Sequence, residues 1–369
     1  MTNGHDATTD RPNVHGLTPE AVVELLRADA CTLVHARSLL ARARSFHPSR
    51  PERHPRHEKV PRRVREAFAA KLDHRGLELV ETVADPSDGF VKFLLRSPDG
   101  ALSEAVRIPL AEPGRFTVCL SSQVGCAMGC VFCATGRLGL TRDLATWEMV
   151  AAFCAVRDSL PDDARITGAV FMGQGEPLHN YDAVIAAANI LADPCGGRVK
   201  AEAISISTVG LVPAIRRYTA EGHRFRLVVS LTSAVNERRL GLLPVTRKWG
   251  LPELADAIRE HVRARGERIT LAWVLMGGVN DGADEVLALR ELLGDLPYKL
   301  NLIDVNADEA DGFRRAAPHE LAAFRDMLRA LGRPIVRRYS GGRERHAACG
   351  MLASRALADQ VTADRSSTA

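Results

Sequence analysis

The chain lacks the features that would place it in or across a membrane. No apolar run approaches the ~20 residues that span a bilayer, and Met1–Asp10 holds no apolar segment of a secretory signal. We therefore expect a cytoplasmic protein without membrane contact. Cysteine is scarce as well, because eight cysteines in 369 residues are too few for a disulfide framework. The composition, 46% hydrophobic, is that of an ordinary globular chain with a full core.

Charge is nearly balanced except in one segment. The formal net charge is +4, yet nine arginines and one lysine stand against three glutamates between Arg37 and Glu66. Four prolines lie in the same segment, which is typical of a solvated linker. Such a segment also attracts a polyphosphate such as RNA through counterion release. The two interpretations are compatible, and the sequence leaves both open.

Hydrophobic patterning divides the chain into parts of different character. A helical segment is expected from Thr18 to about Arg44, and Pro98–Gly100 predicts a hairpin turn in a small α+β region. From Phe116, apolar strands alternate with amphipathic helices, which is the pattern of βα units around a parallel sheet. The expected boundaries are 1–17 (disordered), 18–44 (helical segment), 45–63 (basic linker), 64–115 (small α+β accessory region), 116–340 (partial barrel), 341–353 (C-terminal segment) and 354–369 (flexible tail).

The repeated βα pattern predicts an α/β fold with a partial (βα)6 barrel. A complete eight-stranded barrel takes about 250 residues, more than the pattern covers, and a last apolar run at 335–339 is left over. Chemistry in such barrels collects at the carboxyl ends of the strands. The expected strands are 117–124, 168–172, 203–208, 226–231, 269–275 and 299–305, after accessory strands at 77–83, 91–95 and 105–108. The expected helices are 64–72, 143–159, 180–192, 211–221, 250–265, 283–294 and 318–331.

Three cysteines at one short spacing, Cys126, Cys130 and Cys133, carry the strongest chemical signal. Three thiolates on one loop are one ligand short of a tetrahedral zinc site or a four-cysteine iron–sulfur cluster. Zinc is disfavoured because no fourth cysteine or histidine follows before Thr146. Three merely structural cysteines are the other alternative, but these crowd a glycine-bearing loop directly after an apolar strand. The spacing resembles that of the radical S-adenosylmethionine (SAM) enzymes, in which SAM completes a 4Fe–4S cluster.

Polar groups follow the other strands where a cofactor would need them. The second barrel strand ends in the glycine-rich turn Met172–Leu178 with one carboxylate, which resembles the radical SAM element that holds the methionine ammonium of SAM. Taken alone, it is an ordinary tight turn with an exposed glutamate. The next strands end in Ser205–Gly210 and Ser230–Thr232. Hydroxyls there bind a ribose or a carboxylate, or cap the following helix.

Several independent motifs in order then resemble the RlmN/Cfr family of radical SAM RNA methyltransferases. They are Arg115–Cys126, the turn Gly173–Leu178, Asn301–Ile303 with Asn306, and Ala347–Gly350. The resemblance runs from about residue 85 to 352. It implies a partial barrel with a small N-terminal α+β accessory domain and a C-terminal extension. It also implies a 4Fe–4S cluster and SAM as cofactors, RNA as substrate, an electron donor such as flavodoxin or ferredoxin, and a monomer.

The resemblance also implies a role for individual residues. Cys349 is methylated by one SAM, a 5′-deoxyadenosyl radical takes hydrogen from that methyl group, and the resulting methylene adds to carbon 2 or carbon 8 of an adenine. Glu104 accepts the ring proton, and Cys119 resolves the protein–RNA adduct through a transient disulfide with Cys349. Without the motifs, both cysteines read as small buried hydrophobes, and Glu104 as a surface residue. The implied SAM contacts are Gly175, Glu176, Ser207, Ser230, Leu231, Thr232 and Asn306.

The sequence departs from the family pattern in three places. Thr232 stands where the family has histidine, and Ala307 where it has proline. The N-terminal region carries the arginine-rich linker in place of the family's aromatic pattern, so the RNA can differ. We expect 23S ribosomal RNA first and transfer RNA second. Two alternatives stay open: the same mechanism on another RNA or a non-RNA substrate, and a non-catalytic RNA-binding protein that keeps an iron–sulfur cluster for structure.

Overall fold

The computed structural model describes residues 11–44, 59–306, 312–338, 341–342 and 348–352. Residues 1–10, most of the predicted basic linker (45–58) and the predicted tail (354–369) lie outside the described residues. In the described part of the chain, no helix is long and apolar enough to cross a membrane.

One ten-stranded sheet forms the body of the molecule, in the order β1-β2-β3-β4-β7-β8-β9-β10-β11-β12. The strands from β4 onward pair in parallel, and each is joined to the next by a helix. The predicted partial barrel is confirmed, and the leftover apolar run becomes a further parallel strand. These strands are β4 (Arg115–Leu120), β7 (Arg165–Phe171), β8 (Ile204–Thr208), β9 (Arg226–Ser230), β10 (Ile269–Leu275), β11 (Tyr298–Asp304) and β12 (Ile335–Arg338).

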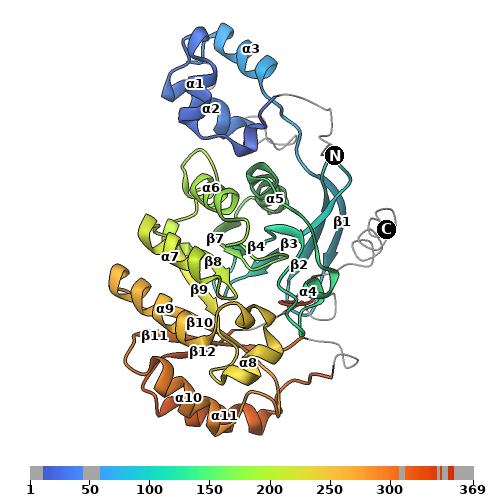
Figure 1. Ribbon diagram of the computed structural model, residues 1–369. Coiled ribbons are helices and arrows are strands. Elements are labelled where there is room, and N and C mark those ends of the chain that lie inside the picture. Colours follow the sequence, from blue (N-terminus) through green and yellow to red (C-terminus); the bar gives the residue numbers. More distant parts are fainter. Residues whose placement is uncertain (1–10, 45–58, 307–311, 339–340, 343–347, 353–369) are drawn as a thin grey trace, which may run out of the picture.

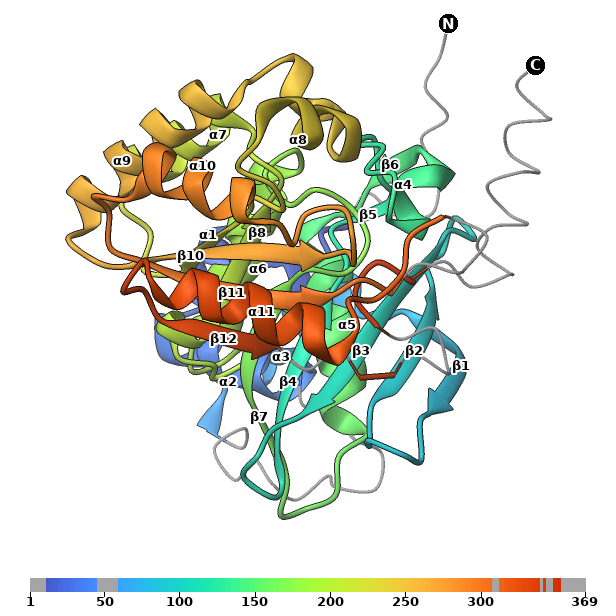
Figure 2. The ribbon, with the colours of Figure 1, turned by 90° about the horizontal axis from the view of Figure 1, so that it is seen from below.

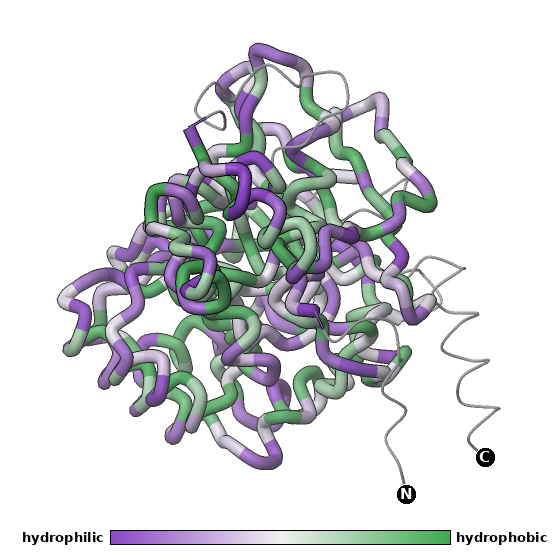
Figure 3. The backbone as a smooth tube through the Cα atoms, turned by 90° about the horizontal axis from the view of Figure 1, so that it is seen from above, coloured by the Kyte–Doolittle hydropathy of each residue, from purple (hydrophilic) through white to green (hydrophobic). Residues whose placement is uncertain are grey.

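The barrel strands have two different faces. On β10, Leu271 and Trp273 point outward into the main hydrophobic core, whereas Ala272 points inward. Figures 1 and 2 show the helices along the outer side, and Figure 3 shows hydrophobic segments gathered toward the centre of the molecule. The helices are α5 (Thr146–Asp158), α6 (Tyr181–Ala192), α7 (Val212–Glu221), α8 (Asn236–Leu242), α9 (Leu251–Arg265), α10 (Ala283–Leu293) and α11 (Pro318–Arg329). The inner face is thereby left free for polar side chains.

The N-terminal helices form a small unit beside the barrel (Figure 1). Two sequence predictions fail here. The single helical segment is two helices, α1 (Pro19–Leu25) and α2 (Leu33–Arg44), because Ala30 adopts a left-handed conformation between them (φ 56°). The expected disorder is wrong for Val14–Gly16, a short 3-10 helix whose valine is fully buried. A third helix, α3 (Arg62–Lys71), packs on the same core.

The accessory strands do not form a sheet of their own. β1 (Glu78–Ala84), β2 (Val91–Arg96) and β3 (Leu102–Pro109) pair antiparallel, and β3 then pairs antiparallel with β4 of the barrel. The predicted hairpin turn is confirmed, and Gly100 takes the positive φ (86°) that it requires. The accessory region thus extends the barrel sheet on one side.

The first barrel strand is shorter than predicted. The expected strand 117–124 divides into β4 and a separate strand β5 (Gln123–Gly125), which pairs with β6 (Leu140–Asp143). The chain turns at Gly125 (φ 77°), where a Cβ atom would lie 1.9 Å from the carbonyl oxygen of Gly139. This close approach shapes the loop that carries the three cysteines. A short helix that the sequence did not predict, α4 (Ala134–Leu138), follows the loop.

Candidate active site

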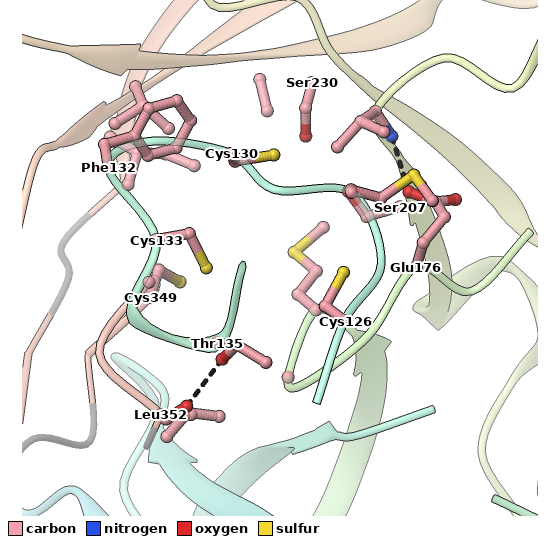
Figure 4. A pocket seen from close by; sticks show the side chains of 18 of the residues that line it. Cys126, Cys130, Phe132, Cys133, Thr135, Glu176, Ser207, Ser230, Cys349 and Leu352 are labelled. Carbon is pink, nitrogen blue, oxygen red and sulfur yellow. Dashed lines mark hydrogen bonds between the residues drawn. The ribbon is translucent and has the colours of Figure 1, made fainter. Parts of the chain in front are cut away.

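A cavity of about 160 Å³ lies at the carboxyl ends of the barrel strands (Figure 4). It collects residues that are far apart in the sequence but follow neighbouring strands. Most of the predicted site residues line it: Cys126, Cys130, Cys133, Gly175, Glu176, Ser207, Ser230, Asn306 and Cys349. Four do not: Cys119, Glu104, Leu231 and Thr232.

The cysteine loop is fixed by backbone hydrogen bonds. The N–H of Cys126 donates to the carbonyl of Gly139 (2.8 Å), and that of Cys133 to the carbonyl of Cys130 (3.1 Å). Burial raises the pKa of Cys126 to about 12, and it also raises the pKa values of Cys130 and Cys133. The three thiols therefore stay protonated at neutral pH unless a metal takes the place of their protons.

The donor set suits an iron–sulfur cluster better than a single ion. Figure 4 shows Cys126, Cys130 and Cys133 around the cavity rather than around one point. In the described residues, no three histidine, cysteine or acidic side chains meet closely enough to hold one metal ion. A 4Fe–4S cluster binds each cysteine at a different iron, so three separated thiols fit it.

Among the described residues, Glu176 is the one buried carboxylate in the cavity wall. Its oxygens accept hydrogen bonds from the N–H groups of Leu178 (3.0 Å) and Val209 (2.9 Å). Burial nevertheless raises its pKa to about 7. No ion-pair partner stands against it among the described side chains, so a cationic group of a bound ligand would find a carboxylate already oriented.

The predicted SAM contacts fall into two groups. Ser207 and Ser230 line the cavity from the ends of β8 and β9, and Gly175 (φ 98°) lies so close to Gln123 that no side chain fits. Leu231 instead belongs to the outer core. Thr232 is fully buried, adopts a left-handed conformation (φ 60°) that β-branched residues avoid, and its hydroxyl has no partner in the described structure.

The C-terminal segment is held over the cavity. The Thr135 hydroxyl donates to the carbonyl of Leu352 (2.6 Å), and the N–H of Ala134 donates to that of Gly350 (2.8 Å). The amide of Asn306, which follows β11, donates to the carbonyl of Cys349 (3.2 Å). These contacts set Cys349 in the cavity wall, where Figure 4 shows its thiol near that of Cys133.

Cys119 lies one packing layer behind Cys349. It belongs to a buried cluster with Val170 and Leu352, and Met172 packs between this cluster and the one that Cys349 contacts. Burial is the main reason that the pKa of Cys119 rises to about 12, and nearby Cys349 adds to it. The two cysteines, 230 positions apart, are therefore neighbours in the fold.

Glu104 lies deeper, on β3, and is connected to the C-terminal segment. Its carboxylate faces the Lys92 ammonium (3.2 Å) and accepts a hydrogen bond from the Gln174 amide (3.2 Å). The same Gln174 amide donates to the carbonyl of Leu352 (3.4 Å). Glu104 is thus a fully buried carboxylate with a positive partner, joined through one side chain to the segment that carries Cys349.

Sequence reasoning missed Arg239, on α8. Its guanidinium is fully buried and donates to three carbonyls at the ends of β8 and β9 and to the Thr246 hydroxyl. Burial lowers its pKa to about 10, and nearby Cys130 opposes that effect. A buried cation beside the cysteine loop offsets negative charge there. One arginine among many in the sequence gives no signal for this role.

A cysteine-lined cavity at the carboxyl ends of a partial barrel defines a radical SAM protein, and the comparisons agree. The Radical SAM superfamily model matches residues 120–292. A crystal structure of a radical SAM methyltransferase from Sphaerobacter thermophilus superposes with a TM-score of 0.82 and 36% identity, covering 92% of this chain and 98% of that one.

Related sequences narrow the family further. A probable RNA methyltransferase from Anaeromyxobacter sp. strain Fw109-5 is 56% identical over 73% of this chain and 80% of its own length. The dual-specificity RNA methyltransferase RlmN of Anaeromyxobacter dehalogenans is 38% identical over 80% of both chains. The chain belongs to the RlmN-like family of radical SAM RNA methyltransferases.

Proposed function

We propose that the chain methylates carbon 2 or carbon 8 of an adenine in RNA, with 23S ribosomal RNA the first expected substrate and transfer RNA the second. One observation carries the proposal: Cys349 lines the same cavity as Cys126, Cys130 and Cys133. A thiol that carries a methyl group there stands beside the place where one-electron chemistry starts. The names of the related RNA methyltransferases support RNA as the substrate.

Family membership implies a 4Fe–4S cluster and SAM, and the cavity residues suit both. The three cysteines of the loop would hold the cluster. Glu176 would face the ammonium of SAM, with the serine hydroxyls at the ends of β8 and β9 beside it. When bound, these groups supply one-electron chemistry and the methyl group. The proposed SAM contacts that line the cavity are Gly175, Glu176, Ser207, Ser230 and Asn306; the predicted contacts Leu231 and Thr232 do not line it.

The chain's own residues would divide the remaining work. Cys349 would accept the methyl group on its sulfur, and that carbon would give up one hydrogen atom to the 5′-deoxyadenosyl group of SAM and bond to the adenine. The ring would then give up one electron to the cluster. Glu104 takes the ring proton, and the Lys92 ammonium, 3.2 Å away, offsets its negative charge in that buried place. The sulfur of Cys119 then bonds to the sulfur of Cys349. The sulfur–carbon bond breaks, and its electron pair stays with the carbon, which takes up a proton.

Burial keeps Cys119 unreactive until that step. A thiol whose pKa is about 12 is protonated at neutral pH and is a poor nucleophile. Its reaction therefore requires a base that takes the thiol proton. Flavodoxin or ferredoxin is the proposed electron donor, and we propose a monomer that acts in the cytoplasm.

Reconstitution with iron, sulfide, SAM and a reductant tests the proposal. The unmodified chain should convert 23S rRNA transcript adenosine to methyladenosine and release 5′-deoxyadenosine and S-adenosylhomocysteine. The Cys349→Ala variant should make no methyladenosine, whereas Cys31→Ala, a buried cysteine outside the cavity, should still make it. SAM cleavage without methylated RNA would point to a non-RNA substrate. No SAM cleavage at all would point to a non-catalytic protein.

A further inference from the structure

The inner face of β9–β12 holds polar and cationic residues that neither SAM nor the cluster uses. Residues on this face alternate with those of the outer core: Tyr298, Leu300 and Leu302 of β11 point outward. Ile303 lies on the opposite side of the same strand and packs inward with Cys349. Asn301 and Lys299 share that inward alternation, so they lie on the same face of β11, toward its amino end from Ile303, which lines the cavity.

Asn301 stands next to the cavity with an unused amide oxygen. Its register partner on β10 is Ala272, which lines the cavity and packs with Cys349. Its side-chain oxygen is buried and has no hydrogen-bond partner in the described structure. A buried amide without a partner costs free energy, so a ligand that supplies the missing donor is favoured at this point.

Cations gather along the same face. Lys299 is two residues before Asn301 on β11 and therefore points to the same inner side. Arg226 is the first residue of β9 and points to the same side as Val228, which packs inward. Neither has an ion-pair partner among the described residues. The pKa of Lys299 is lowered, first by burial and then by repulsion from Arg226, Arg268 and Arg338. Four like charges near one another, none of them in an ion pair with a described carboxylate, form a place for an anion.

Arg338 connects this basic face to the reactive cysteines. It ends β12 as the register partner of Ile303, and its guanidinium reaches across to the thioether sulfur of Met172 (2.8 Å). A thioether is a weak acceptor, so the guanidinium keeps its capacity for a stronger one. Arg338 is also close enough to Cys119 to oppose the rise of its pKa. The cations therefore run from the two thiols to the opposite end of the strands.

We infer that the inner face of β9–β12 binds the target nucleotide, with Asn301 reading the adenine edge while Lys299 and Arg338 hold the flanking phosphates. An asparagine amide matches the amino group and ring nitrogen of adenine, and Lys and Arg are the usual phosphate partners. The position fits, because a base in contact with Asn301 lies beside Ala272 and hence beside Cys349. The inference rests on the proposed function, since it names the site for the RNA substrate.

Binding of short single-stranded oligomers tests this site directly. We expect the chain reconstituted with its cluster and SAM to bind oligoadenylate at least about fivefold more tightly than an oligomer of purine riboside, which lacks the 6-amino group. Asn301→Ala should abolish that difference, and Asn301→Gln should restore part of it. Lys299→Ala and Arg338→Ala should each reduce the slope of log affinity against log salt by about 0.7.

Controls separate this site from general electrostatics and from free nucleotides. Arg224→Ala removes an exposed arginine two residues from Arg226 that is paired with Glu202, and it should leave both slope and preference unchanged. Adenosine monophosphate should bind much more weakly than the oligomer. Equal affinity for both would contradict RNA as the ligand.

Two further results keep the inference distinct from the proposed function. Suppose that the unmodified chain methylates RNA, but that the Asn301, Lys299 and Arg338 variants keep its salt slope and its preference for adenine. The proposed nucleotide site is then wrong, and the proposed function stands. If the variants change slope and preference as expected but the unmodified chain methylates no RNA, the site stands and the proposed function fails. RNA methylation by each variant is expressed relative to its own SAM cleavage without RNA, and melting temperatures identify variants that do not fold.

Discussion

The two ends of the barrel interior treat charge in opposite ways. At the cavity, each buried charge has fixed partners: Glu176 accepts backbone N–H groups, and Arg239 donates to carbonyls and a hydroxyl. Toward the amino ends of β9 and β11, Arg226 and Lys299 have no ion-pair partner among the described residues, and they are exposed or half-buried. A small cofactor is matched by groups already in place, whereas a polyanion is matched by cations that remain available.

The largest expected effect is the loss of iron and SAM cleavage at the cavity without any change in RNA binding at the other end. Cys130→Ala removes one of three cluster ligands, so iron content and SAM cleavage should fall to background. The inner face is untouched, so the variant should bind oligoadenylate with the salt slope of the unmodified chain. Iron analysis and fluorescence anisotropy measure the two properties. Cys154→Ala, a buried cysteine in the outer core, is the matched control and should keep its iron.

A second prediction concerns stability and compares one arginine from each end. Arg239→Met leaves three carbonyls and a hydroxyl without their donor, so the free energy of unfolding should fall by at least about 3 kcal/mol. Arg226→Met removes an exposed cation and should change it by no more than about 0.5 kcal/mol. Urea unfolding of the metal-free chains measures both. An equal fall in the free energy of unfolding for both variants would contradict this difference between the two arginines.

The smallest effect is a dependence on pH at the cofactor end. Burial raises the pKa of Glu176 from 4.5 to about 7, so the folded state favours the protonated carboxyl. Its contribution to stability is therefore fully present below about pH 4.5 and is lost as the pH rises to about 7, by up to about 3 kcal/mol. Glu176→Gln should remove this part of the pH dependence. Identical pH profiles for the metal-free variant and the unmodified chain would contradict the assignment.

The sequence predicted the parts of this fold that depend on short-range pattern. Strands such as β10 and β11 were found because a buried parallel strand is a continuous apolar run. The expected strand 117–124 was wrong at its end because the break falls at residues 121–122, where the N–H of Ser122 donates to the carbonyl of Gln174, a contact between segments far apart in the sequence. The joining of β3 to β4 was likewise out of reach, since which edge a strand pairs with is not encoded within the strand.

The candidate site shows the same division. Cys126, Cys130 and Cys133 share one loop, so their spacing alone predicted a common site. The nearness of Cys119 and Cys349 follows only from the family resemblance or the fold, because 230 residues separate them. Asn301 had been noted only as part of a motif. Its unused amide oxygen is visible only once the register of β10 and β11 places it against Ala272.

Mass spectrometry of RNA nucleosides, together with the peptide that carries Cys349, tests most directly whether Cys349 carries the methyl group to adenine. In cells that express the unmodified chain, we expect adenosine methylated on carbon 2 or carbon 8 and a methyl group on the Cys349 sulfur. In cells that express Cys349→Ala, both should be absent. Carbon-methylated adenosine at the unmodified level in the Cys349→Ala cells would contradict the account.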